Sequence, residues 1–393
     1  MTLRLLRTAA FALCVTLLAT SAAHADEPAW GLKATGLAGA PVADGDGRSA
    51  RIAVEPSFKW KLRGVELRAR ERVRWLDREG DRRTDADVRE LTASWRGGET
   101  TVTVGAQQLN WGRMDILRVT DVINPVDQRD LFYEELPEAK LALWMANLEW
   151  QSGSQTLQVI ATPQVPVDRF PSHWSGVPVQ VSKPGAALTN ATLAVRYGFE
   201  SLGWNADVMA VRGWQTSPPL RPVIDATGLR LQGAMSRQNS IGFSADKPLG
   251  ATVLRLEGLY ARLTPDSDAV GLGFRPRRQA SLGAGLDVRA GPWFFAGQVI
   301  AQHDRDTSTG SGNNAFVSAI IQRKWMQDRL SARGLQIRET RSGSSWSSLQ
   351  LSYELSPNQL VQVQGDWFKG AAAQAFGSLK ERSRVAASMR LQF

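Results

Sequence analysis

The chain has 393 residues, with 47 Lys and Arg, 38 Asp and Glu, and a single cysteine. That cysteine, Cys14, lies in a segment that we expect to be removed, so the mature chain has no disulfide or cysteine metal site. No run of about twenty apolar residues follows residue 25, which excludes a transmembrane helix. The positive charge accompanies no nucleic-acid-binding module and no glycine motif that cradles phosphate, so we expect no nucleic-acid partner.

The first 25 residues are typical of a secretory signal peptide. Two arginines precede a short apolar run, Phe11 to Ala19, and Ala23-His24-Ala25 offers a cleavage site between small residues. The run is too short to cross a bilayer as a helix. We therefore expect residues 1–25 to be cleaved and residues 26–393 to form a single exported domain.

From residue 29 onwards, segments of roughly ten residues alternate apolar and polar side chains, as transmembrane β-strands do. Short connections such as Arg63-Gly64 alternate with long ones such as 77–86 and 110–141. Eight short and nine long connections predict an all-β, antiparallel transmembrane barrel of 18 strands, with 16 left open, short periplasmic turns and long extracellular loops. A secreted sandwich or solenoid would also alternate, but the signal peptide, the even spacing and the fourteen tryptophans favour a barrel.

Two hairpins predict a strand register. Across Arg63-Gly64, Trp60 faces Leu67 and Lys61 faces Glu66. Across Gly97-Gly98, Ala93 faces Val102 and Leu91 faces Val104. A slip of one residue would turn both apolar faces over, so the shared parity is informative. In the first hairpin Glu71 falls on the lipid side, which predicts a β-bulge or local exposure.

Basic residues line the inner face of the first hairpin, and Lys59 faces Arg68 with no acid between them. Stripes of Arg and Lys favour anionic permeants, so we predict an anion-attracting wall. The alternatives are arginines that only solvate a water-filled wall, and a site for anionic lipopolysaccharide. The predicted wall comprises Arg51, Lys59, Lys61, Arg68, Arg70, Arg72 and Arg74.

The longest loop, residues 110–141, is rich in acids. An acidic loop and a basic wall in one barrel predict that the loop folds into the lumen and narrows the pore, as in general porins. The alternative is a loop that only caps the mouth. The candidates for the constriction are Arg113, Asp115, Asp121, Asn124, Asp127, Arg129 and Asp130.

The stretch from Val104 to Leu131 carries a resemblance. Trp111-Gly112, the acid Asp115 and Asn124-Pro125 with Asp127 two residues on resemble a segment of a proteobacterial porin-like family catalogued largely as a domain of unknown function. It is also similar in style to alginate-export-type barrels. The resemblance implies an outer-membrane barrel with a structured loop, and it implies no substrate.

Candidates for catalysis and metal binding are weak. His173 and His303 stand in no recognisable catalytic motif, and His303-Asp304 is interpreted as a solvated pair at the barrel rim. The acids of 44–47 and of 81–87 match no complete calcium loop. We therefore expect no enzyme activity, no cofactor and no metal.

The C-terminal strand has Val385, Met389 and Phe393 on one face and polar residues on the other. A terminal aromatic residue resembles the closing strand of Gram-negative outer-membrane barrels, where it is an assembly signal. The chain is thus predicted to reside in the cell outer membrane as a porin-like channel for small anionic or zwitterionic solutes. The alternative is a barrel that exports or assembles an acidic polysaccharide or lipid. Expected partners are outer-membrane lipid, lipopolysaccharide, the barrel-assembly machinery and small solutes, and a homotrimer is left open.

Overall fold

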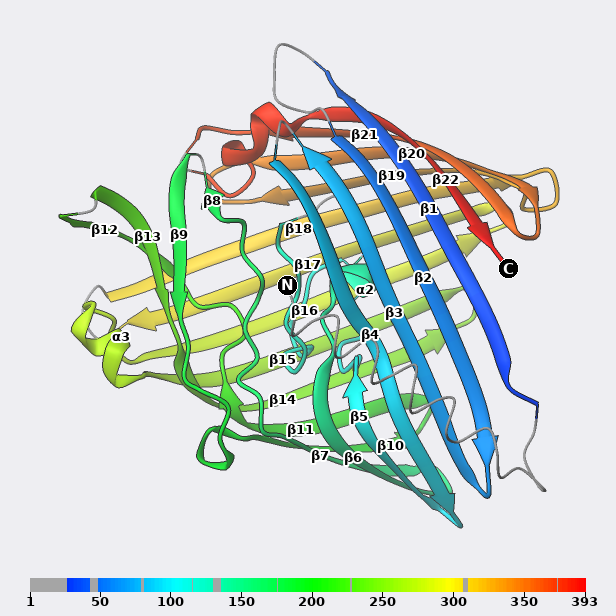
Figure 1. Cartoon of the computed structure of the whole chain (residues 1–393), viewed down its shortest axis with the longest axis horizontal. Helices are drawn as coiled ribbons and strands as arrows, with labels where there is room; N and C mark the ends of the chain where they lie inside the picture. The colour runs from blue at the N-terminus through cyan, green and yellow to red at the C-terminus, as the bar shows by residue number, and fades with distance from the viewer. Residues whose placement is uncertain are drawn as a thin grey trace.

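The computed structural model describes residues 27–42, 49–78, 81–114, 116–129, 136–174, 176–226, 228–306, 310–372 and 374–393. The expected signal peptide lies outside the described residues. Eighteen antiparallel strands form a closed ring, in which each strand pairs with its neighbours in the chain and β1 pairs with β22 (Figure 1). The predicted 18-stranded all-β barrel is confirmed.

The strands of the ring are β1 (Ala29–Pro41), β2 (Ser49–Leu62), β3 (Val65–Arg78), β4 (Asp81–Gly97), β5 (Thr100–Gln107), β6 (Leu143–Ser152), β7 (Gln155–Thr162), β10 (Thr192–Ser201), β11 (Trp204–Trp214), β14 (Ser236–Leu249), β15 (Thr252–Pro265), β16 (Arg277–Ala290), β17 (Trp293–Asp306), β18 (Gly310–Trp325), β19 (Leu330–Glu339), β20 (Ser345–Ser356), β21 (Gln359–Lys369) and β22 (Arg384–Gln392). One end of the ring carries only tight turns, and we call it the short-turn rim. The opposite end is the long-loop rim. Both chain ends of the ring, at β1 and β22, lie at the short-turn rim.

The long-loop rim carries the remaining elements. A four-stranded sheet there combines two separate loops, because β13 pairs in parallel with β9. It stands at the left of Figure 1. These elements are β8 (His173–Trp174), β9 (Val177–Ser182), β12 (Leu220–Asp225), β13 (Gly228–Ala234), the helix α3 (Ser267–Gly271), and the 3-10 turns η1 (Leu188–Asn190) and η2 (Gly377–Arg382).

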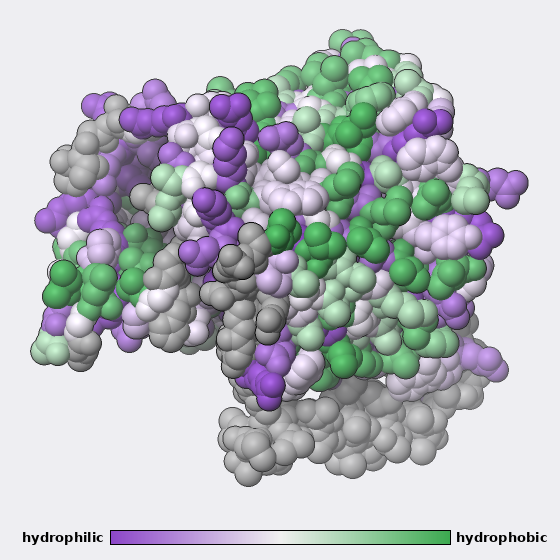
Figure 2. Space-filling view, turned by 90° about the horizontal axis from the view of Figure 1, so that it is seen from above, coloured by the Kyte–Doolittle hydropathy of each residue, from purple (hydrophilic) through white to green (hydrophobic). Residues whose placement is uncertain are grey.

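The outer face of the ring is apolar. On β2 and β3, Ile52, Val54, Val73 and Trp75 are exposed, while the residues between them turn inward. Exposed tryptophans such as Trp95 lie close to strand ends, as an interfacial girdle requires. Figure 2 shows hydrophobic side chains over the wall of strands and hydrophilic ones gathered at the long-loop rim. No helix of the described residues is long and apolar enough to span a membrane.

The first predicted register is confirmed. Trp60 pairs with Leu67 and Lys61 with Glu66. Arg63 and Gly64 both have positive φ, at 49° and 82°, which is the backbone of the type I′ turns that suit the right-handed twist of a hairpin.

The second predicted register is wrong by two residues. Ala93 pairs with Val104, not with Val102. The turn consists of Gly98 and Glu99, and Gly98 has a φ of +57°. The turn lies here because a glycine readily adopts the positive φ that the first central position of a tight hairpin turn requires. The shift by two leaves every side chain on its predicted face.

The predicted bulge is found at Glu71. Arg70 pairs with Glu90 and Glu71 with Val88, so Arg89 is the extra residue, on β4. The bulge turns Arg89 inward, where only 3% of it is exposed. The loop predicted at 77–86 is mostly strand, since β3 runs to Arg78 and β4 begins at Asp81. These two strands extend beyond the apolar belt, where the alternation that marks a lipid-facing strand is no longer required.

Candidate functional site

The described residues of the segment 108–142, which joins β5 to β6, pack inside the ring, where Figure 1 shows the helix α2 (Leu136–Ala139) enclosed by strands. We call this segment the lumen loop. Asn124 ties its two ends together. The amide of Asn124 donates to the carbonyls of Gln107 at 2.9 Å and Leu141 at 2.8 Å, and its oxygen accepts from Leu109 N at 2.8 Å. Asn124 is fully buried, so it holds the loop in shape and does not face a solute.

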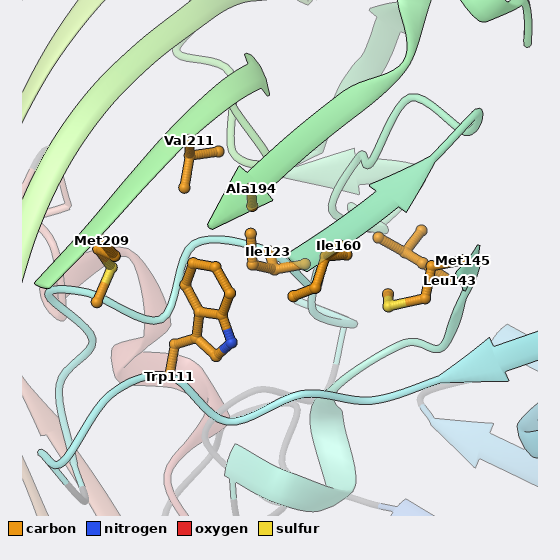
Figure 3. Packing of buried hydrophobic residues seen from close by; sticks show 8 residues of the cluster. All are labelled: Trp111, Ile123, Leu143, Met145, Ile160, Ala194, Met209 and Val211. Carbon is orange, nitrogen blue, oxygen red and sulfur yellow. The ribbon is translucent and has the colours of Figure 1, made fainter. Parts of the chain in front are cut away.

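An apolar cluster anchors the first part of the lumen loop to the wall. Trp111 is 1% exposed and its indole nitrogen donates to Gln158 Oε1 of β7 at 2.9 Å. Its ring packs beside Ile123 of the loop (Figure 3). The wall residues in the cluster are Leu143, Met145, Ile160, Ala194, Met209 and Val211.

A second anchor joins the loop to β11, β14 and β15. The Glu257 carboxylate accepts from Met114 N at 2.7 Å, from Thr120 N at 3.0 Å and from Thr120 Oγ1 at 2.8 Å. Arg113 forms ion pairs with Asp207 and Asp246. Arg113, a constriction candidate, is therefore occupied by two wall carboxylates.

The third anchor is ionic and lies against the basic wall. Asp127 Oδ2 lies 2.9 Å from Arg74 Nη2 of β3, 2.7 Å from Arg129 Nη2 and 3.5 Å from Arg169 Nη1. Burial raises the pKa of Asp127. The hydrogen bonds and charges of these three guanidinium groups lower it more, so the pKa lies well below its usual range. Asp127 thus holds the loop as a permanent anion.

The helix α2 completes this contact. Glu138 Oε1 lies 2.9 Å from Lys33 Nζ of β1, and Arg72 Nη1 donates to the Glu138 carbonyl at 3.0 Å. Burial raises the pKa of Glu138, but Lys33, Arg89 and Arg72 together lower it to about 2. The loop carbonyl of Lys140 accepts from Arg89 Nη1 at 2.6 Å.

A cavity of about 810 Å³ lies beside the lumen loop, and we call it the loop-side cavity. Its polar wall comes from β2 and from β19 to β22, with Arg51, Arg333, Arg390, Gln350, Gln362 and Gln364. Its apolar wall combines Ile116 and Leu117 of the loop with Phe316, Leu335 and Phe376. No described acid pairs with Arg333 or Arg390 in this structure.

The predicted basic wall is divided by the lumen loop. Arg72 and Arg74 are each 2% exposed and lie under the loop, while Arg51 faces the loop-side cavity. Lys61, Arg68 and Arg70 line a separate cavity towards the short-turn rim, and Lys59 is exposed nearby. The expectation that no acid separates Lys59 from Arg68 is wrong, because Glu66 pairs with both. A side chain on the same hairpin can reach diagonally across the ladder.

The remaining constriction candidates and Phe393 lie in different parts of the structure. Asp121 is buried and lies 2.5 Å from Lys140 Nζ, and Arg129 pairs with Asp85 of β4 at 2.9 Å. Asp115 and Asp130 lie outside the described residues. Phe393 is exposed at the short-turn rim, where its backbone nitrogen donates to Leu32 O at 2.8 Å.

Several charged residues of the site escaped the sequence analysis: the bases Lys33, Arg89, Arg169 and Arg333, and the wall acids Asp207, Asp246 and Glu257. Arg89 had a detectable signal, because the consecutive charges Arg89-Glu90 interrupt the alternation of β4. Lys33 and Arg333 lie on inward positions and could have been found by the same parity rule. Arg169 had no signal, because it lies in an irregular loop that enters the barrel only in the tertiary structure.

The side chains of His303 and Asp304 face opposite sides of β17. His303 is exposed and lies 2.5 Å from Asn313 Oδ1, while Asp304 accepts from Gln302. Among residues 81–87, Asp85 and Asp87 pair with arginines, and residues 44–47 lie outside the described part of the chain. The described residues contain no group of acidic, histidine or cysteine side chains suited to a metal ion.

Searches for similar sequences found no matching family model and no matching curated protein. Solved structures do share the fold. OccAB1 of Acinetobacter baumannii has a TM-score of 0.57 at 9% identity, over 94% of this chain and 96% of that one. OccK3 of Pseudomonas aeruginosa has a TM-score of 0.56 at 13% identity, over 93% and 95%. OccK5 of the same organism has a TM-score of 0.54 at 10% identity, over 93% and 96%.

Proposed function

We propose that the protein is a passive outer-membrane channel of porin type for small anionic or zwitterionic solutes, with its short-turn rim facing the periplasm. The closed ring, its apolar outer belt and the fold shared with the Occ structures support a membrane-spanning barrel. The lumen loop crosses the interior and leaves the loop-side cavity of about 810 Å³ as the route. A cavity of this volume suits a small molecule better than a polymer, which favours a channel over a polysaccharide exporter.

The observation that carries the proposal is the charge of the loop-side cavity. Arg51, Arg333 and Arg390 reach it from strands on one side. Guanidinium groups bind carboxylates and other oxyanions through paired hydrogen bonds. Glu55 and Asp168 line the same cavity, so both ends of a zwitterion find a complementary charge.

The test is the ion selectivity of single channels in planar bilayers under a salt gradient. We expect the wild-type channel to prefer anions. The double variant Arg333→Gln/Arg390→Gln should shift the reversal potential towards cation preference, because two cations leave the route.

The control is Arg305→Gln, which removes one charge from the outward face of β17 and should leave the reversal potential unchanged. Absence of conductance would overturn the channel. A selectivity that the double variant does not alter would overturn the assigned route. Liposome swelling with anionic, neutral and cationic solutes of equal size then ranks the permeants.

A further inference from the structure

A second cavity, of about 800 Å³, lies at the short-turn ends of β2 to β5. We call it the turn-side cavity. It shares no lining residue with the loop-side cavity. Arg89 of β4, Gln107 of β5 and Gln108 at the start of the lumen loop also line it. Two of them hold one loop atom, because Arg89 Nη1 and Gln108 Nε2 donate to Lys140 O at 2.6 Å and 2.8 Å. The cavity is therefore a recess beneath the anchored loop.

Cations dominate the lining of the turn-side cavity. Two carboxylates, Glu66 and Glu90, also line it. Glu66 is shared between Arg68 and Lys59, and Glu90 lies 4.0 Å from Arg68. The lining cations are Lys61, Arg63, Arg68, Arg70, Arg89 and Arg96.

Several of these cations form no ion pair, although Glu66 lies opposite Lys61 and Glu90 opposite Arg70 across the ladder. Among the described residues, no carboxylate forms an ion pair with Lys61, Arg63, Arg70 or Arg96. Cations of like sign around one recess repel one another at low dielectric. A bound anion would relieve that repulsion, and an anion of higher charge would relieve more of it.

The positions of the cations favour an anion with several oxygens. Lys61 comes from β2, Arg70 from β3 and Arg96 from β4, so the charges converge from three strands. Hydroxyls of Thr92, Ser94 and Thr103 line the same cavity. Ser94 and Thr103 are hydrogen-bonded to each other at 2.9 Å, so Thr92 and one hydroxyl of that pair can donate further hydrogen bonds. Trp95 is the one large apolar residue in the lining, and its side chain belongs to the exposed outer face of the ring. The recess therefore suits a compact, highly charged oxyanion and offers little to an apolar body.

We propose that the turn-side cavity binds multivalent oxyanions of the phosphate and pyrophosphate class, at a site separate from the route through the loop-side cavity. Arginine forks and a lysine ammonium are the usual ligands of such groups. Binding requires only the folded barrel and not conduction, although the periplasmic side of the site rests on the proposed orientation. The site would concentrate multivalent anions at the inner mouth.

The test is calorimetric titration of the purified, detergent-solubilised barrel with pyrophosphate at low and high salt. We expect binding that weakens as the salt concentration rises. The variant Lys61→Gln/Arg70→Gln should weaken it at least tenfold, and acetate at equal concentration should not displace pyrophosphate.

Two controls place the site. Arg305→Gln should bind pyrophosphate as the wild type does, because that charge lies on the outer face. Arg333→Gln/Arg390→Gln should also retain binding, and loss of binding in this variant would assign pyrophosphate to the loop-side cavity and overturn the proposal. No binding by the wild type, or equal binding by Lys61→Gln/Arg70→Gln, would also overturn it.

Two further experiments separate a failure to fold from a loss of binding, and the binding site from the channel. If the double variant does not fold, Arg96→Gln, near the turn, replaces it, with a smaller loss of affinity expected. In bilayers, pyrophosphate added on the short-turn side should reduce the anion current more than pyrophosphate added on the other side, because it neutralises cations at that mouth without entering the route. A barrel that binds pyrophosphate but does not conduct would uphold this site and overturn only the channel.

Discussion

The carboxylate of Asp127 is completely enclosed, and the guanidinium groups around it come from three parts of the chain. Arg74 belongs to a strand, Arg129 to the lumen loop and Arg169 to the loop after β7. The backbones of the two loops are joined as well, since Gln128 N donates to Arg169 O at 2.9 Å. One buried anion thus joins two inward loops to the wall.

Replacing Asp127 by Asn should lower the free energy of unfolding by about 3–5 kcal/mol, because it leaves buried guanidinium groups without their anion. Urea titration of the refolded barrel measures the change. The matched control is Asp77→Asn, which breaks an ion pair with Arg82, a side chain that is 75% exposed. Loss of this surface ion pair should cost about 0–1 kcal/mol. Equal effects of the two variants would show that Asp127 does not anchor the loop.

The pKa of Glu138 predicts an acid sensitivity. Its pKa falls from 4.5 to about 2 in the folded protein, so the ionised form stabilises the fold above pH 4.5. That contribution is lost as the pH falls towards 2. The melting temperature of the wild type should therefore drop more between pH 4.5 and 2 than that of Glu138→Gln. If the melting temperatures of the two proteins fell equally over this pH range, Glu138 would not be the source of the acid sensitivity.

At the scale of elements, β5 is short and turns the chain into the lumen. Gly105 makes that exit possible with a φ of +131°, and a Cβ atom there would lie 2.0 Å from Leu91 O. Side chains rarely adopt this backbone, and the carbonyl of the paired strand cannot move away without breaking the ladder.

The variant Gly105→Ala should therefore lose most of its folded barrel. The fraction that resists unfolding in cold detergent on a gel measures this directly. Gly36→Ala is the matched control in β1, since a Cβ atom there meets nothing within 4 Å, and it should fold like the wild type. Normal folding of Gly105→Ala would mean that the exit from β5 tolerates another path.

Elements also show where sequence reasoning was strong and where it was weak. The parity of each strand and the bulge at Glu71 were predictable, because alternation is a local property that every residue of a strand reports. The register across Gly98 was wrong by two residues, because a shift of two preserves parity and only the turn geometry distinguishes the choices.

At the scale of the whole molecule, the ring closes where its two ends meet. The backbone of Phe393 exchanges hydrogen bonds with Leu32 at 2.8 Å and 3.0 Å, and the residue as a whole is 71% exposed. The backbone contact closes the barrel whatever the side chain is. The side chain is exposed, which the predicted recognition by the assembly machinery would require.

This separation gives a test of the assembly signal. Phe393→Ala should refold in detergent as the wild type does, because the backbone bonds stay, yet its assembled fraction in cells should fall several-fold. Phe199→Ala removes an exposed aromatic ring from β10 near the same rim and should assemble normally. If Phe393→Ala assembled in cells as well as the wild type does, Phe393 would not be the assembly signal.

The sequence by itself determined the barrel and the face of the strand on which most side chains lie, and it favoured 18 strands while leaving 16 open. The reason is that lipid on the outer face and the polar interior on the other impose an alternation with a period of two on every strand. Only the tertiary structure decided which arginines lie under the loop and which face a cavity. Arg74 meets Asp127 across 53 residues, and Arg113 meets Asp246 across 133. Such pairings depend on how the closed ring brings distant segments together, and no local pattern records them.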